Sequence, residues 1–313
     1  MNLSLLMVER LYIWIHSTEG RRTVVKDVNL AVRAGEPLTL IGETGSGKTL
    51  VAQAILNLLP EEMRAYGSIS FKGCDILNMK SRVRKQIWGQ KIFLFPQEPI
   101  LALNPTMQAI AQVKEIFQWV MGLNRKLSLK AVVRILDTVG LNPEQDARRY
   151  PHQLSGGMRQ RLLTAMAMAE PADLIVADEP TKGLDFERRN AVVAQLDNLV
   201  KKGKSLVTIT HDLEVARMLE GWLAVMYGGC VVEQGPCSQV LDRPLHPYTK
   251  ALLASLPANG LRPIPYKVNR RPTKRGCVFA DRCTLAEEAC FEQEPESRWA
   301  PGKSECRCTR SLR

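Results

Sequence analysis

Hydrophobic and polar positions along the chain predict strands that alternate with helices. The apolar run Leu174 to Ala177 and the run Ser205 to Thr210 are short and bounded by polar residues, as is typical of buried parallel strands. Apolar residues from about 99 to 147 recur at helical spacing instead. Because strands that alternate with helices pack as a sheet covered by helices, we predict an α/β fold.

The first part of the chain has a strand pattern that leads into one helix. Residues 3–40 read as short strands joined by turns, and the last of these strands is Pro37 to Ile41. A glycine-rich loop follows. Helical spacing then runs from about Lys48 to Leu59, where Pro60 ends it. The sequence therefore places a glycine loop between a strand and a helix.

A change in composition near Asp242 predicts a domain boundary. Before it, we expect one large α/β domain over residues 1–241, with a helical subdomain over about residues 99–165. After it, prolines and then cysteines become frequent. Residues 242–313 are too few and too rich in proline for a large core, so we expect this extension to pack on the main domain or to be held by a metal centre.

Hydropathy and charge limit where the chain can work. No stretch reaches the roughly 20 apolar residues that cross a bilayer, and the first residues lack the pattern of a secretory signal. We therefore expect a cytoplasmic chain that meets a membrane through partner proteins. The net charge is +11, from 43 lysines and arginines against 32 aspartates and glutamates. This charge fits an anionic membrane surface or nucleic acid, and we favour the membrane surface and expect no nucleic-acid partner.

The segment GETGSGKT fits the phosphate-binding pattern G-x-x-x-x-G-K-[ST] in full, in the strand–loop–helix context that the pattern requires. Its glycines let backbone N–H groups surround an anion at the start of the helix. Lys48 would neutralise the β- and γ-phosphates of a nucleotide, and Thr49 would bind Mg²⁺. The predicted nucleotide-binding residues are Gly42, Glu43, Thr44, Gly45, Ser46, Gly47, Lys48 and Thr49.

The segment DLIVADEPT places two carboxylates at the end of an apolar strand. Asp178 would hold the shell of the Mg²⁺ ion, and Glu179 would orient or deprotonate the attacking water. A second strand, SLVTIT, leads directly to His211. Parallel strands bring their ends to one edge of a sheet, where ligands bind. We therefore predict that Glu179 and His211 are catalytic, with His211 at the γ-phosphate.

These residues, together with LSGGMRQR at Leu154 to Arg161, resemble the ATP-hydrolysing subunits of ABC transporters. Gln97 is similar to the Q-loop glutamine of that family, and Asp185 to the aspartate of its D-loop. The resemblance implies an ABC-type P-loop ATPase domain with a helical subdomain and a small cysteine-rich C-terminal extension. It also implies that ATP and Mg²⁺ bind, that Lys48 and Gln97 contribute to catalysis, and that Gln97 contacts the metal.

The resemblance further implies that two ATPase subunits stack head to tail. Ser155, Gly156 and Gly157 of one subunit would cap the γ-phosphate held by the other, because the start of a helix offers backbone N–H groups to an anion. The expected partners are a homologous ATPase subunit in a heterodimer, two membrane permeases and, indirectly, an extracytoplasmic solute-binding protein. The expected location is peripheral, on the cytoplasmic face of the cell membrane.

The extension resembles one branch of the family. HPYTKALLASLP and GCVFADRC are similar to the C-terminal region of importers for oligopeptides, dipeptides and nickel. The implied solutes are therefore peptides, nickel or other metal chelates, or related small molecules. Clustered thiolates can surround a [4Fe–4S] cluster or Zn²⁺, and the branch favours the cluster over zinc or ordered thiols without metal. The expected ligands are Cys277, Cys283, Cys290 and Cys306, with Cys308 as the alternative to Cys306.

Two questions stay open from the sequence. Family members usually stack adenine on an aromatic ring, but Ile15 falls at that place here, with Tyr12, Trp14 and His16 nearby. The second question is the assembly. A soluble ABC-type ATPase that serves an enzyme complex, as in phosphonate breakdown, would share every catalytic motif, and only its partners would differ.

Overall fold

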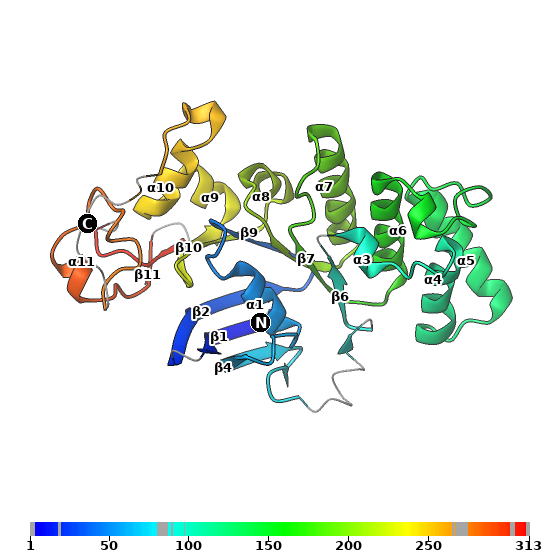
Figure 1. The fold of residues 1–313 in the computed structure, drawn as a ribbon, viewed down its shortest axis with the longest axis horizontal. Helices are drawn as coiled ribbons and strands as arrows, with labels where there is room; N and C mark the ends of the chain where they lie inside the picture. The colour runs from blue at the N-terminus through cyan, green and yellow to red at the C-terminus, as the bar shows by residue number, and fades with distance from the viewer. Residues whose placement is uncertain are drawn as a thin grey trace. The chain divides into compact units, whose positions relative to one another are not determined.

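The computed structural model describes residues 4–17, 20–79, 87–88, 90–96, 98–264, 266, 275–300 and 304–310. The chain divides into two compact units. The first unit contains Met1–Arg33, Pro37–Leu77 and Ile209–Arg313, and the second contains Ala34–Glu36 and Asn78–Thr208. In Figure 1 the second unit runs from cyan to green, while the first unit is blue at its beginning and yellow to red at its end.

An antiparallel sheet in the first unit has the order β2-β1-β4-β5 (Figure 1). The sequence predicts several short strands here, whereas β1 and β2 are long. Register shifts at Val8/Leu11 and Leu11/Ile13 interrupt the alternation of apolar residues, so that one bulged strand resembles several short ones. The strands are β1 (Ser4–Ser17), β2 (Gly20–Arg33), β4 (Met63–Phe71) and β5 (Cys74–Asp75).

A second sheet in the first unit combines strands from distant parts of the chain. Its order is β11-β12-β10-β9-β3. Strands β3 and β9 run parallel, and Ile41 at the end of β3 pairs with Val225. The strands are β3 (Pro37–Ile41), β9 (Trp222–Tyr227), β10 (Cys230–Pro236), β11 (Arg298–Trp299) and β12 (Glu305–Cys306).

The helices of the first unit are short. The helix after the glycine loop ends at Ile55 and not at Leu59, because Asn57 adopts a φ of 51° and turns the chain. The helices are α1 (Lys48–Ile55), α8 (Leu213–Leu219), α9 (Cys237–Asp242), α10 (Pro247–Ala254) and α11 (Ala289–Glu292), with a 3-10 turn, η3 (Pro257–Asn259).

The second unit contains strands in the order β8-β7-β6, and β6 and β7 run parallel. These strands are β6 (Ile92–Phe95), β7 (Leu174–Asp178) and β8 (Ser205–Ile209). Its helices are α3 (Pro99–Ala102), α4 (Ala109–Glu115), α5 (Arg125–Thr138), α6 (Gly156–Ala169) and α7 (Phe186–Lys201), with a π-helical turn, η1 (Ile116–Val120), and a 3-10 turn, η2 (Pro151–Gln153). The α/β class is therefore confirmed. In the part of the chain that the structure describes, no helix combines the length and apolar character needed to cross a bilayer.

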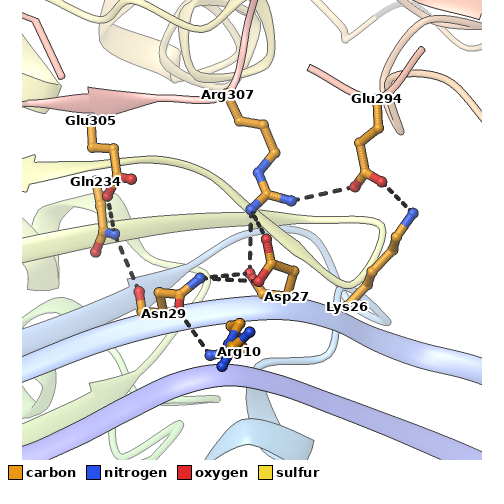
Figure 2. A network of polar contacts seen from close by, with 8 residues as sticks. All are labelled: Arg10, Lys26, Asp27, Asn29, Gln234, Glu294, Glu305 and Arg307. Carbon is orange, nitrogen blue, oxygen red and sulfur yellow. Dashed lines mark hydrogen bonds and ion pairs between the residues drawn. The ribbon is translucent and has the colours of Figure 1, made fainter. Parts of the chain in front are cut away.

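A buried arginine fastens the end of the chain to its beginning within the first unit (Figure 2). The Arg307 side chain is 9% exposed and donates to the carboxylate of Asp27 at 2.7 Å and to that of Glu294 at 3.3 Å. Glu294 also pairs with Lys26. A buried cation needs such partners, because an unpaired charge in this position would cost several kcal/mol, roughly 3–5.

Amide contacts continue this network along β10. The Gln234 side chain donates to Glu305 at 2.6 Å and to the backbone carbonyl of Asn29 at 3.2 Å. The Asn29 side chain in turn accepts from the N–H of Arg10 at 2.8 Å (Figure 2). Glu294 and Arg307 therefore contact β2, and Glu305 contacts β10, within the first unit.

Candidate nucleotide site and cysteine cavity

The phosphate loop joins β3 to α1 in a tightly packed glycine turn. Gly42, Gly45 and Gly47 have φ angles of 152°, 83° and 99°, which side chains disfavour. A β-carbon at Gly42 would collide with the carbonyl oxygen of Met226, and one at Gly47 would lie 3.0 Å from Cγ2 of Val25. Packing within this chain therefore requires both glycines, and it leaves a loop whose backbone can close around an anion.

The Lys48 ammonium group is held inside this loop. Its Nζ donates to the carbonyl oxygens of Gly42 at 2.8 Å and Glu43 at 3.0 Å, and Lys48 is 6% exposed. Thr49, the next residue, is exposed in the first turn of α1. A buried cation surrounded by carbonyl oxygens gains strongly from an arriving phosphate oxygen. The donor set therefore fits a nucleotide phosphate with a metal ion beside Thr49.

The tip of the loop is open and its base is anchored. Thr44 and Gly45 are exposed, whereas Ser46 is buried. The N–H of Ser46 donates to the Glu43 carbonyl at 3.2 Å, and its carbonyl accepts from the N–H of Gly229 at 3.1 Å. The loop thus presents its outer residues to solvent from a fixed base.

His211 lies in the first unit and directly follows a residue that is hydrogen-bonded to β3. The N–H of Thr210 donates to the carbonyl of Leu40 at 3.0 Å, so the chain reaches His211 at the end of β3. His211 is exposed, and Asp212 then caps α8 by accepting from the N–H of Glu214 at 2.9 Å. The structure therefore brings this predicted catalytic residue to the edge of the sheet from which the loop departs.

The acid pair belongs to the second unit and has an unusual backbone. Asp178 ends β7, and Glu179 follows with a φ of 46°. A residue other than glycine in this region stores strain of about 1–3 kcal/mol, and such outliers concentrate at functional sites. The Gln160 side chain donates to the carbonyl of Pro180 at 2.9 Å and fastens the turn to α6. The motif predicts the two carboxylates but not this conformation.

The signature segment begins α6 and is exposed. Ser155 caps the helix, since its hydroxyl accepts from the N–H of Met158 at 3.3 Å. Ser155, Gly156 and Gly157 are all exposed. A β-carbon on either glycine would meet no atom of the described residues within 4 Å, and neither glycine has a positive φ. Packing within the described chain therefore does not require glycine at these two positions.

The signature glycines share a cavity with the residues around Asp185. The cavity has a volume of about 270 Å³, and its walls include Gly156, Gly157, Leu184 and Arg188. Asp185 caps α7 by accepting from the N–H of Arg188 at 2.9 Å, and it pairs with the guanidinium of the same residue at 3.3 Å. The second unit therefore brings together the signature segment and the predicted D-loop aspartate.

Two further predictions concern Gln97 and the aromatic ring that stacks on adenine. Gln97 lies outside the described residues. Among the aromatic candidates for adenine, Trp14 already carries the Arg21 guanidinium 3.4 Å from its ring centroid and stacks with Tyr66 at 6.4 Å. Trp14 is therefore engaged by its own sheet.

The cysteines of the extension converge in the first unit, but not as the predicted set. Cys277, Cys283, Cys290 and Cys308 line one small cavity whose other walls are mainly apolar. Cys306 is set apart, because it is buried in β12, where it pairs with Glu233 of β10. The chain leaves the sheet after Cys306 and reaches the cavity two residues later. The cavity therefore groups Cys308, the alternative fourth ligand, and not Cys306 with the other three cysteines.

The cavity is also bordered by a buried histidine. Burial raises the pKa of Cys277 to about 12 and also raises the pKa of Cys283. Burial lowers the pKa of His246 to about 3, so its ring is neutral. Its Nδ1 accepts from the N–H of Tyr248 at 3.0 Å, which leaves the proton on Nε2. Nε2 is buried without a hydrogen-bond partner among the described residues, and His246 lines the cavity together with the four cysteines.

Direct coordination of a single ion is a different matter. Within the described ranges, no group of three or more histidines, cysteines, aspartates or glutamates is arranged to hold a metal ion. A tetrahedral zinc site needs its ligands about 2.0–2.3 Å from one ion. The described cysteines line a cavity without forming such a group.

A phosphate loop, an acid pair at a strand end and a signature helix together define a P-loop ATPase of the ABC type. The family model described as ABC transporter matches residues 25–182, and the model described as oligopeptide/dipeptide transporter, C-terminal region, matches residues 232–290. The chain belongs to the ABC transporter family as an ATP-hydrolysing, ATP-binding subunit.

Curated relatives extend over nearly the whole chain. The oligopeptide transport ATP-binding protein OppD of Salmonella typhimurium is 35% identical over 310 residues, which cover 96% of this chain and 92% of OppD. OppD of Bacillus subtilis is 35% identical, with 93% and 84% covered. A putative peptide import ATP-binding protein of Brucella abortus is 36% identical, with 93% and 90% covered. These names do not favour the soluble enzyme assembly.

Solved structures confirm the predicted fold. The cassette MJ0796, in a dimeric post-hydrolysis state bound to ADP and Pi, is 26% identical with a TM-score of 0.64 and covers 74% of this chain and 98% of its own. The cbiO1 protein of Clostridium perfringens has a TM-score of 0.65 at 24% identity and covers 81% and 95%.

Proposed function

We propose that this chain hydrolyses ATP to energise the import of peptides. The observation that carries this proposal is the match of residues 232–290 to the oligopeptide/dipeptide transporter C-terminal region, directly after an ABC ATPase segment. In this proposal residues 1–241 form the ATPase domain, with a helical subdomain over about 99–165, and residues 242–313 form the extension. Nickel or other metal chelates belong to the wider expectation, and none of the relatives named above supports them.

In this proposal the phosphate loop and the acid pair have different roles. Lys48 moves from backbone carbonyls to the β- and γ-phosphates, where it neutralises negative charge. Thr49, Asp178 and Gln97 are the residues that would hold Mg²⁺, and the ion would supply neutralisation of the charge on the transferred phosphoryl group. Glu179 orients and deprotonates the attacking water, and the His211 side chain donates to the γ-phosphate.

The site is completed by a second subunit. The N–H groups at Ser155, Gly156 and Gly157 begin a helix and are exposed, as an anion cradle for another subunit requires. Asp185 lies between Leu184 and Arg188, which line the same cavity, and contributes to that contact. The proposed assembly is a heterodimer with a homologous ATPase subunit on two permeases, at the cytoplasmic face of the membrane, supplied by an extracytoplasmic solute-binding protein. Nucleic acid has no role in it.

Purification from membranes tests the assembly. A tagged chain should co-purify with two permeases and a second ATPase subunit, and proteoliposomes containing this complex should take up radiolabelled oligopeptides only with ATP. Uptake that is equal without ATP, or co-purification with soluble enzymes and no permease, would overturn the proposal. Competition by a peptide mixture against nickel chelates then identifies the class of solute.

We also propose that the cysteine cavity holds a [4Fe–4S] cluster. Each iron of such a cluster takes one cysteine, so ligands spread around a cavity suit it better than they suit one ion. The Nε2–H of His246, which has no hydrogen-bond partner among the described residues, would be a donor for a cluster sulfur. In anaerobically purified protein, Cys308→Ser should lower iron content and broad visible absorbance, while Cys306→Ser should retain both. Equal iron in both variants, or zinc alone in the wild type, would refute this assignment.

A further inference from the structure

We infer that the C-terminal extension positions the phosphate loop, through Tyr248 and Arg282 acting on Glu43. Both residues lie far along the chain from the loop, at sequence separations of 205 and 239 residues. All three residues belong to the first unit. Tyr248 and Arg282 act on the loop from behind and are therefore positioning residues for ATP binding.

The first contact is made to the backbone of the loop. The N–H of Glu43 donates to the Tyr248 hydroxyl at 3.0 Å. Tyr248 is fully buried, and burial raises the pKa of its hydroxyl, so it remains a neutral phenol. The Glu43 N–H therefore has a fixed acceptor inside the protein and does not turn toward the phosphate side of the loop.

Tyr248 is itself held from several directions. Its N–H is capped by His246 at the start of α10, and the N–H of His246 donates to the buried carboxylate of Glu233 at 2.9 Å. Its ring packs against Tyr227 at 4.6 Å and Phe279 at 5.4 Å between centroids. These contacts leave the Tyr248 hydroxyl little freedom to follow a moving loop.

The second contact is made to the side chain of the same loop residue. Arg282 donates to the Glu43 carboxylate at 2.9 Å and to the Tyr227 hydroxyl at 3.2 Å. Its side chain is only 17% exposed, and its guanidinium lies 5.6 Å from the Tyr227 ring centroid. Arg282 directly precedes Cys283, so the segment that lines the cysteine cavity also supplies this contact.

The geometry of one peptide group explains why these contacts matter for nucleotide. The Gly42 carbonyl and the Glu43 N–H belong to the same trans peptide plane and point in opposite directions. Lys48 contacts the carbonyl end at 2.8 Å, and Tyr248 contacts the N–H end. Tyr248 therefore fixes the plane when Lys48 leaves it for a phosphate. Without the Tyr248 hydroxyl, the peptide plane between Gly42 and Glu43 can rotate. The binding of ATP must then also order the loop.

The decisive variant is Tyr248→Phe, which removes one oxygen and keeps the ring. Titration of the full-length chain with a fluorescent ATP analogue should show a dissociation constant about fivefold higher, the size expected for one hydrogen bond. Turnover of the assembled transporter at saturating ATP should change less than twofold, because the positioning acts before chemistry. Tyr66→Phe is the matched control, since Tyr66 is 67% exposed in β4 of the same unit, and its dissociation constant should be unchanged.

A double-mutant cycle tests Arg282 separately and does not depend on the fold of the Tyr248 variant. Arg282→Gln should raise the dissociation constant about two- to threefold, as a partly exposed ion pair allows. In a Glu43→Gln background, the same substitution should have no further effect. Unchanged binding in Tyr248→Phe and Arg282→Gln would overturn the inference. An equal Arg282→Gln effect in both backgrounds, or lost turnover with unchanged binding, would do the same.

Discussion

The phosphate loop and the signature segment are both glycine-rich turns before a helix, but their surroundings differ. In the loop, a β-carbon at Gly42 collides with β9, and Lys48 is buried among carbonyl oxygens. In the signature segment, Gly156 and Gly157 are exposed, and β-carbons there would have no described atom within 4 Å. The phosphate loop is packed against its own chain, whereas the signature segment is open to solvent.

This difference indicates where each glycine is needed. Gly42 is needed to fold the loop, so its role is visible within one chain. Gly157 has no such role among the described residues, so a requirement for a small residue there would come from what approaches it. In the proposed assembly, a nucleotide held by the second ATPase subunit approaches this position.

The largest expected effect separates binding from turnover. Glu179→Gln should lower ATP hydrolysis by about 10²–10⁴, the usual contribution of a general base. ATP binding should be retained, because the phosphate loop is fastened within the other unit by its own contacts. Steady-state phosphate release and nucleotide titration measure the two quantities. Glu187→Gln, at an exposed position in the first turn of α7, is the control and should hydrolyse normally. Normal hydrolysis by Glu179→Gln would remove that residue from its assigned role.

The next prediction compares an alanine substitution in the phosphate loop with one in the signature segment. Gly42→Ala should lower the free energy of unfolding by about 1–3 kcal/mol, because the new methyl group overpacks against Met226. Gly157→Ala should leave that free energy unchanged or raise it by up to about 1 kcal/mol, since alanine favours helices. Its hydrolysis should nevertheless fall at least tenfold, because the methyl group keeps the partner nucleotide away.

Chemical denaturation of the isolated chain and hydrolysis by the assembled transporter check this pair. The control is Lys182→Ala, because Lys182 is exposed like Gly157 and lines the same cavity. Asn190 in α7 is partly buried, so Asn190→Ala would not match Gly157 in exposure. Full hydrolysis by Gly157→Ala would contradict the composite site. Strong unfolding by Gly157→Ala would show that the segment is needed for folding after all.

The smallest expected effect is that acidification changes the stability of the two units in opposite directions. His246, in the first unit, has a folded pKa of about 3, below the unfolded value of 6.5, because burial disfavours its charge. The unfolded chain therefore binds more protons between these values, and His246 costs about 2 kcal/mol of stability on acidification to pH 5. Glu170, in the second unit, has its pKa raised by burial to about 7, so acidification stabilises that unit.

Neighbouring charges must be separated from the effect of His246. The Glu233 carboxylate faces His246, and its pKa is raised by burial, which opposes the histidine; Lys250 lies nearby as well. Comparing the wild type with His246→Asn isolates the imidazole, because an asparagine oxygen can still cap α10. Hydrogen exchange, corrected for the intrinsic pH dependence, should show faster opening around α10 at pH 5 only in the wild type. Equal opening in both proteins would exclude His246 as the source.

The strand–loop–helix geometry of the phosphate loop could be predicted, because it follows from the order of the residues along the chain. Gly42 to Thr49 and the acid pair after β7 could be located in this way. The long strands β1 and β2 were predicted as several short strands, because bulges break the alternation that identifies a strand. The left-handed Glu179 has no sequence signal, since strain depends on the surrounding packing.

Contacts between distant segments explain the remaining differences. Cys306 and Cys308 are equivalent by spacing, and only the pairing of β12 with β10 distinguishes them. The hydrogen bond from Glu43 to Tyr248 joins residues 205 positions apart, and no local sequence pattern predicts it. Such contacts follow from tertiary packing, which single-sequence periodicity does not contain.

The ion pair between Asp27 and Arg307 has a consequence for biosynthesis. Its two residues are 280 positions apart, and a ribosome adding about 5–20 residues per second needs roughly 14–56 seconds to make the stretch between them. The residues of the second unit emerge during this interval. Strand β2 is therefore translated long before its buried arginine partner, and the first unit reaches its final packing only after Arg307 has been made.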